Sequence, residues 1–260
     1  MRVSMSDIPN YASQGEGPVL LFLHGIGGNH QSFDWQLPAF ADRWRAVSWD
    51  MPGYGASAPL TEMTFENLAH AVARLLDHLD ASTAAIVGHS MGGMVAQEFM
   101  VHYPGRTSAV VLSGTSPSFG KPGKWRDDFL GQRLAPLDKG LSPADFAGDL
   151  VSNMMSEDAL EAAKVSAMAS MSALPAATYR SALNCLVTFN QRDKLGDISC
   201  PTLALPGEFD EAAPAPMMEK MASHIPDCRY HCLPGVGHLA NLEDPEQFNR
   251  AIRTFLDEVA

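Results

Sequence analysis

A serine stands at the centre of Gly88-His89-Ser90-Met91-Gly92-Gly93, between the apolar run 84–87 and a stretch with helical spacing. A turn that passes from a strand to a helix within about one residue strains the backbone and lifts its central side chain above the edge of the sheet. Glycines beside the turn remove the collisions that larger side chains would cause. This setting makes Ser90 the candidate nucleophile of a hydrolase.

A serine hydroxyl is a poor nucleophile at neutral pH, so it needs a nearby base and an acid that orients the base. His238 ends the loop that follows the strand-like run 228–233, and Asp210 follows the apolar run 202–206. We predict that Ser90, Asp210 and His238 form a catalytic triad, in the chain order serine, acid, histidine.

Other acids are alternatives to Asp210. Glu208 and Glu211 are its neighbours in the same loop. Residues 113–118, which follow the preceding strand and are the usual alternative place for the acid, contain neither Asp nor Glu. Asp210 is therefore the preferred partner of the histidine.

The segment His24-Gly25-Ile26-Gly27-Gly28 follows the apolar run 18–23. Its glycines let the backbone approach a ligand closely, and we predict that Gly25 contacts the substrate. The amides of Ile26 and Met91 are predicted to form the oxyanion hole, because the second donor is normally the residue after the nucleophile. We expect His24 to brace this loop and His89 to face away from the substrate.

Five motifs carry a resemblance to a known family: HGIGG, WDMPGYGAS at 49–57, GHSMGG, LPGEFD at 205–210 and PGVGHLANLEDPEQFN at 234–249. Together they resemble the α/β-hydrolase superfamily over nearly the whole chain except its middle. The resemblance implies the fold and the triad of that family. The ending HLANLEDPEQFN is most similar to the esterase and 3-oxoadipate enol-lactonase-like branch.

Three other branches fit less well. Carbon–carbon bond hydrolases of aromatic-ring degradation usually have Trp after the catalytic histidine, where this chain has Leu239. Epoxide hydrolases and haloalkane dehalogenases use Asp where this chain has Ser90.

The elements that must position these residues alternate between strands and helices, which predicts an α/β fold with a mostly parallel twisted sheet flanked by helices. Only about 17 residues precede the first strongly apolar strand, where the family usually fits two strands, so the first strand is expected to be short or missing. Helices are expected over 65–79 and 245–259. The predicted strands are 18–23, 45–49, 84–88, 108–113, 201–206 and 228–233.

Between 117 and 196 the pattern contains no convincing strand, and Ser142-Pro143, Ser156-Glu157-Asp158 and Pro175 each resemble helix starts. We therefore predict a core domain formed by 1–117 and 197–260, with a helical cap at 118–196 that covers the site and selects the substrate. The predicted substrate contacts in addition to Gly25 are Trp125, Phe129, Met154 and Leu239.

The cap differs from the core in charge. Residues 118–196 contain nine basic and nine acidic side chains, so the entire net charge of −12 belongs to the core. We hypothesise that basic side chains at the start of the cap form a cationic rim. Such a rim would attract an anionic substrate to an otherwise acidic protein. Its members are Lys121, Lys124, Arg126 and Arg133.

Composition bounds the function. With 260 residues, 46% of them hydrophobic, the chain can bury a full core, while its charge of −12 disfavours nucleic acid as a partner. We expect no signal peptide, no membrane span and a cytoplasmic location. Four cysteines show no disulfide framework and no standard zinc spacing, so we expect buried free thiols. No metal or organic cofactor is needed, and a monomer or homodimer is expected.

The sequence thus predicts a serine hydrolase that cleaves an ester or an enol-lactone of a small molecule, including carboxylate-bearing ones, through an acyl-enzyme on Ser90. Two alternatives use the same triad: a carbon–carbon bond hydrolase of ring-cleavage products and a cofactor-free haloperoxidase or perhydrolase. A third alternative, of another class, is a slow-turnover ligand receptor with a hydrolase fold.

Overall fold

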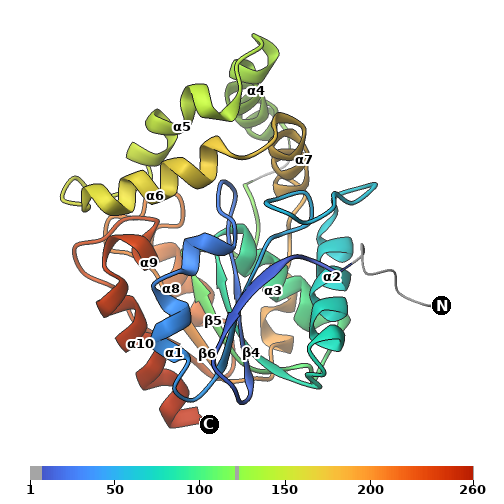
Figure 1. Ribbon diagram of the computed structural model, residues 1–260, viewed down its shortest axis with the longest axis vertical. Coiled ribbons are helices and arrows are strands. Elements are labelled where there is room, and N and C mark those ends of the chain that lie inside the picture. The colour runs from blue at the N-terminus through green and yellow to red at the C-terminus, as the bar shows by residue number, and fades with distance from the viewer. Residues whose placement is uncertain (1–7, 121–122, 260) are drawn as a thin grey trace.

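The computed structural model describes residues 8–120 and 123–259, and it contains one seven-stranded sheet (Figure 1). The strand order is β1-β3-β2-β4-β5-β6-β7. All neighbours pair in parallel except β1, which runs antiparallel to β3. The strands are β1 Tyr11–Gln14, β2 Val19–Leu23, β3 Arg45–Trp49, β4 Ala84–His89, β5 Thr107–Ser113, β6 Thr202–Leu205 and β7 Cys228–Tyr230.

The predicted strands agree with these to within a few residues, and the fold class is confirmed. The first strand, which was expected to be short or missing, exists and spans four residues. All six residues of β4 are buried, because helices cover both faces of the sheet. Such a strand appears in the sequence as a continuous apolar run rather than an alternating one.

Ten α-helices and two 3₁₀ helices are found in the described residues. The α-helices are α1 Gln36–Phe40, α2 Phe65–His78, α3 Met91–His102, α4 Lys124–Asp138, α5 Pro143–Ser152, α6 Glu161–Ser172, α7 Ala176–Leu186, α8 Ala215–Ala222, α9 Ala240–Glu243 and α10 Pro245–Val259. The 3₁₀ helices are η2 His30–Phe33 and η3 Arg192–Asp197.

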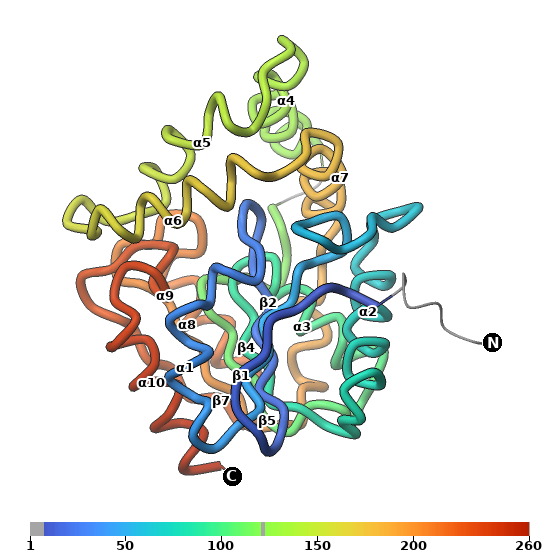
Figure 2. The backbone as a smooth tube through the Cα atoms, viewed as in Figure 1, coloured from blue at the N-terminus to red at the C-terminus, as the bar shows by residue number. Residues whose placement is uncertain are grey.

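Two apolar clusters fill the space on either side of the sheet. One packs α2, α3 and α8 against the sheet, and the other packs α1 and α10 (Figures 1 and 2). In α2 the predicted apolar positions Leu68, Val72, Leu75 and Leu76 are all fully buried. None of the described helices is long and apolar enough to cross a membrane.

Helices α4 to α7 lie between β5 and β6 in the chain and stand above the sheet at one end (Figure 1). The predicted start at Ser142-Pro143 is confirmed, since Ser142 forms a capping box with Asp145. Pro175 precedes α7 as predicted. None of the residues in α4 is buried, so this helix is held by partly exposed contacts.

The predicted helix start at Ser156-Glu157-Asp158 is wrong. The chain makes a turn there, closed by a hydrogen bond from the Ala159 amide to the Ser156 carbonyl at 3.2 Å, and α6 begins only at Glu161. A tertiary contact is part of this turn, since the Ser156 amide donates to the buried side chain of Glu243, a distant residue that no local pattern reveals.

Candidate active site

Ser90 lies between β4 and α3 with φ 54° and ψ −121°, a left-handed conformation that is uncommon for a residue with a Cβ. The three neighbouring glycines allow the tight packing of this turn. A Cβ at Gly88, Gly92 or Gly93 would lie 2.6, 2.1 or 2.7 Å from its nearest neighbour. The Thr115 hydroxyl donates to the Ser90 carbonyl at 2.7 Å and holds the strained turn from the end of β5.

Asp210 and His238 form a hydrogen-bonded pair. His238 Nδ1 lies 2.8 Å from Asp210 Oδ2, and the other carboxylate oxygen accepts from the amides of Ala212 and Ala213, each at 2.8 Å. Burial alone would raise the pKa of Asp210, but the charge of His238, its hydrogen bond and the Ala213 amide together lower it. An ionised carboxylate can only accept hydrogen bonds, so Nδ1 donates and Nε2 keeps its lone pair for the cavity.

The neighbouring acids lie elsewhere. Glu208 accepts a hydrogen bond from the Gly235 amide at 2.9 Å, and Glu211 lines the cavity wall. Among the acids predicted for this loop, Asp210 is the one bonded to His238.

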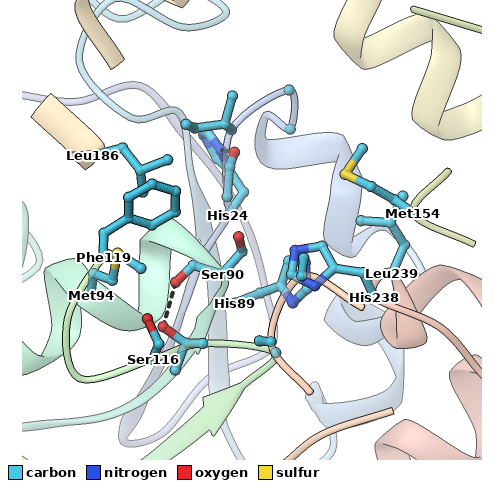
Figure 3. Close-up of a pocket in the computed structure, with 18 of the residues that line it drawn as sticks. His24, His89, Ser90, Met94, Ser116, Phe119, Met154, Leu186, His238 and Leu239 are labelled. Carbon is cyan, nitrogen blue, oxygen red and sulfur yellow. Dashed lines mark hydrogen bonds between the residues drawn. The ribbon is translucent and has the colours of Figure 1, made fainter. Parts of the chain in front are cut away.

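Ser90 and His238 line one cavity of about 1180 Å³ between the sheet and helices α4 to α7. Figure 3 shows the Ser90 side chain directed into this cavity beside the His238 ring. Within the described residues no hydrogen bond joins Ser90 Oγ to the His238 ring. Of the two contacts in the predicted triad, the structure therefore contains the one between His238 and Asp210 but not the one between Ser90 and His238. Such catalytic hydrogen bonds are often long until substrate binds.

The predicted oxyanion loop passes directly beside the serine. A Cβ on Gly25 would lie 2.7 Å from Ser90 Cβ and 3.1 Å from Ser90 Oγ, so only glycine fits. Met91 begins α3, where the first amides have no partner within the helix. In the described part of the chain, neither the Ile26 amide nor the Met91 amide donates to another protein group. The assignment of these two amides to an oxyanion hole stays a prediction.

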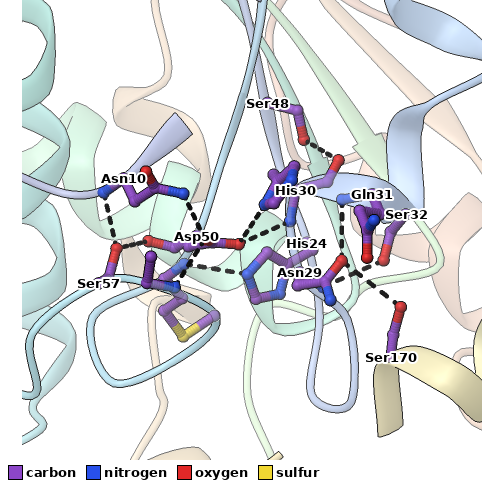
Figure 4. A network of polar contacts seen from close by, with 12 residues as sticks. Asn10, His24, Asn29, His30, Gln31, Ser32, Ser48, Asp50, Ser57 and Ser170 are labelled. Atoms are coloured by element: carbon purple, nitrogen blue, oxygen red, sulfur yellow. Dashed lines mark hydrogen bonds and ion pairs between the residues drawn. The ribbon is translucent and has the colours of Figure 1, made fainter. Parts of the chain in front are cut away.

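His24 braces this loop, as predicted. Its Nδ1 donates to the Gly25 carbonyl at 2.8 Å, and its Nε2 accepts from the Met51 amide at 3.0 Å (Figure 4). Nearby, the buried carboxylate of Asp50 accepts from the His30 amide and ring, each at 2.9 Å, and from Asn10 at 2.7 Å. The segment that follows β2 is therefore fastened to the segment that follows β3, which holds the loop that contains Gly25 and Ile26 in place.

The expectation that His89 faces away from the substrate is wrong. His89 lines the cavity, and its ring centroid lies 4.9 Å from that of His238. It is 5% exposed, its Nε2 has no hydrogen-bond partner, and burial lowers its pKa to about 3. His89 is therefore an uncharged side chain that packs beside the His238 ring.

Two buried histidines predict how stability changes with pH. Burial lowers the pKa of His24 to about 4 and of His89 to about 3, against 6.5 for each in the unfolded chain. The unfolded chain binds more protons below pH 6.5, so stability falls as the pH drops, by up to about 1.4 kcal/mol per unit for each ring. We expect the midpoint temperature of unfolding to decrease as the pH is lowered from 6.5 to 4.5. The decrease should be less steep in His89→Gln. An equal slope in both proteins would contradict this.

The five predicted substrate contacts all line the cavity: Gly25, Trp125, Phe129, Met154 and Leu239. Phe119, Trp125 and Phe129 form a ring cluster in which Trp125 and Phe129 stack at 5.7 Å. This part of the wall is apolar and suits the carbon skeleton of a substrate.

The predicted cationic rim is only partly present. Arg133 lines the cavity, whereas Lys124 pairs with Asp128 at 2.6 Å and Lys121 lies outside the described residues. Arg126 is not among the cavity-lining residues. Two cations that sequence reasoning missed, Arg192 and Lys220, also line the cavity, because η3 and α8 fold against its rim.

The remaining expectations concern metal ligands and cysteines. No group of three or more His, Cys, Asp or Glu side chains in the described ranges is arranged to hold a metal ion. All four cysteines are free, as predicted, but only Cys185 and Cys200 are buried, since Cys228 and Cys232 are partly exposed near the sheet edge.

Comparison with known proteins gives the family. Residues 18–245 match the family model of the alpha/beta hydrolase fold. The chain belongs to this family. Among curated proteins, 3-oxoadipate enol-lactonase 2 of Acinetobacter baylyi is 27% identical over 253 residues, which cover 95% of this chain and 92% of that protein.

Two further relatives extend the range of chemistry within the alpha/beta hydrolases. A candidate non-heme bromoperoxidase of Mycobacterium tuberculosis is 30% identical and covers 96% of this chain and 97% of its own length. The structure of a thermophilic esterase from Thermogutta terrifontis, with malate bound, superposes with a TM-score of 0.89 at 26% identity, covering 96% of this chain and 93% of that one. The esterase and enol-lactonase-like branch predicted from the sequence is therefore confirmed.

Proposed function

We propose that this protein is a serine hydrolase that cleaves a small carboxylic ester or enol-lactone through an acyl-enzyme on Ser90. One observation carries the proposal: the His238 ring, which is hydrogen-bonded to Asp210, lines the same cavity as Ser90, a serine held at positive φ. The names of the relatives, an enol-lactonase and an esterase, support the same class of reaction.

In the proposed mechanism, Ser90 Oγ attacks the substrate carbonyl carbon while His238 Nε2 takes the hydroxyl proton. The Ile26 and Met91 amides stabilise the oxyanion, and Asp210 stabilises the imidazolium. His238 then returns the proton to the leaving alkoxide or enolate as the carbon–oxygen bond breaks. A water molecule, activated by the same ring, attacks the acyl-enzyme and releases the acid.

We also propose that residues 118–196 act as a cap, distinct from a core made of 1–117 and 197–260. Met154 and the ring cluster around Phe129 supply the apolar wall of the cavity from this segment. Substrate choice then resides in α4 to α7, while the reacting groups stay on the sheet.

The test of the proposed function is a panel of small aryl esters and enol-lactones, with and without a serine-directed phosphonate. We expect turnover of at least one of these substrates and its complete loss after the phosphonate reacts. Turnover that persists in phosphonate-treated protein would overturn the proposal.

A perhydrolase is the second candidate, supported by the bromoperoxidase name of one relative. It differs in one step, because hydrogen peroxide instead of water attacks the acyl-enzyme and yields a peracid. Adding peroxide to the ester assay and measuring peracid separates the two activities.

The charges in the cavity favour an anionic substrate. Arg133, Arg192 and Lys220 line it, and none of them pairs with a carboxylate in the described part of the chain. Arg192 instead donates to the Ser118 hydroxyl at 2.6 Å. A carboxylate on the substrate would meet cations here although the chain as a whole carries −12.

We predict that Arg192→Gln raises KM about fivefold for a carboxylate-bearing ester and leaves a neutral ester within about twofold, as expected for an exposed ion pair. Added salt should reduce the difference. Lys124→Gln is the matched control, because Lys124 already pairs with Asp128. Equal effects of Arg192→Gln on both esters would contradict an anion-binding role.

A further inference from the structure

Glu243 is a buried acid that takes no part in the proposed chemistry. It ends α9 and is 6% exposed. One side-chain oxygen lies 2.8 Å from the Ser156 amide, and both lie 3.1 Å from the Gly237 amide. Burying such a group is tolerated only when its oxygens are hydrogen-bonded, so this arrangement is specific.

The two amides belong to different segments of the chain. Gly237 immediately precedes His238, whereas Ser156 lies in the turn between α5 and α6 that also contains Met154. A third hydrogen bond joins the same segments directly, from the His238 amide to the Met154 carbonyl at 2.8 Å. Figure 1 shows α6, which this turn leads into, standing over α9.

The junction is closely packed. A Cβ on Gly237 would lie 2.9 Å from the Met154 carbonyl oxygen and 2.9 Å from the Ser156 nitrogen. The loop that carries the base therefore touches the turn that carries Met154, and Figure 3 shows Met154 and His238 on the same side of the cavity. The position of one segment fixes the position of the other.

Two separate groups thus hold His238. Asp210 orients its ring through Nδ1, and Glu243 helps to hold its backbone through the preceding amide. A displacement of about 1 Å in a reacting group can reduce catalysis about 100-fold, so backbone support matters as much as ring orientation.

We propose that Glu243 is a positioning residue that fastens the His238 loop to the turn at 153–156. It thereby keeps the base and Met154, which lines the cavity, in a fixed position relative to each other. This inference rests on the proposed function in that His238 is taken as the base. It assigns a role to a side chain that does not reach the reacting atoms.

Two variants with one matched control test the proposal. Glu243→Ala removes both acceptor oxygens, and Glu243→Gln keeps the shape with one of them. Arg253→Ala is the control, because Arg253 also joins distant segments by hydrogen bonds to Asp42 but does so outside the cavity. All proteins are assayed at a temperature well below their unfolding midpoints.

For a short aryl ester we expect kcat to fall about 10- to 100-fold in Glu243→Ala, with KM within about threefold of wild type. Glu243→Gln should lie between wild type and Glu243→Ala, and Arg253→Ala should keep kcat within about twofold. A folded Glu243→Ala protein with the kcat of the control would overturn the proposal.

A second measurement does not depend on turnover. The proton on His238 Nδ1, held by Asp210, gives a downfield proton NMR signal, which we expect in wild type and Arg253→Ala and expect to broaden through solvent exchange in Glu243→Ala. An unchanged signal in Glu243→Ala would overturn the proposal. If the signal responds as expected while Ser90→Ala retains ester turnover, the proposed function fails and the positioning role of Glu243 stands.

Discussion

Replacing Ser90 by alanine is expected to lower kcat for ester hydrolysis by about 10⁶-fold, because members of a triad act as a unit. The alanine variant keeps the Asp210–His238 pair and the oxyanion donors but has no oxygen to form the acyl-enzyme. The measurement is kcat on the best ester of the panel, with enough enzyme to detect slow turnover.

Ser116→Ala is the matched control for this result. Ser116 lines the same cavity, but its hydroxyl donates to the Ser118 carbonyl at 2.9 Å and has no link to His238. We expect its kcat to stay within a few-fold of wild type. If Ser90→Ala kept more than about one hundredth of the wild-type kcat, the acyl-enzyme mechanism would be wrong.

Asp210→Asn is expected to lower kcat by about 10⁴-fold while the fold is retained. The Asp210 carboxylate only accepts hydrogen bonds, which keeps the His238 proton on Nδ1. An asparagine amide can donate to Nδ1 and thereby place the proton on Nε2, where the base must be free. Measuring kcat as a function of pH separates this tautomer effect from a simple shift of the pH range in which the enzyme is active.

Glu208→Gln provides the control for Asp210→Asn, because Glu208 is two residues away and bonds the Gly235 amide. It should keep kcat within about twofold. A larger loss in Glu208→Gln than in Asp210→Asn would transfer the role of the acid to Glu208.

The parts of the fold that depend on local pattern were predictable from the sequence. Apolar runs located the central strands, and the helix spacing of Leu68, Val72 and Leu75 identified α2. The order of Ser90, Asp210 and His238 along the chain also predicted a close pair, since loops after parallel strands meet at one edge of the sheet. The hydrogen bond between Asp210 and His238 agrees with that expectation.

What depends on distant packing was not predictable. Arg192 and Lys220 reach the cavity only because η3 and α8 fold against its rim, and neither belongs to a motif. The turn at 156–159 that precedes α6 was also missed, and its amide at Ser156 bonds Glu243, which is 87 residues away. His89 was expected to face away because its sequence position does not reveal that its ring packs beside His238.

Helix α4 has a consequence for how this enzyme family member can change. None of its residues is buried, although Phe129 and Arg133 on it face the cavity. Substitutions at exposed positions usually alter the free energy of unfolding by less than about 0.5 kcal/mol, whereas Phe129, Leu130, Leu134 and Leu137 pack against the core. New preferences can therefore be selected at Trp125 and Arg133, which are exposed and line the cavity, with little risk to folding, which makes these positions the natural starting point for laboratory evolution.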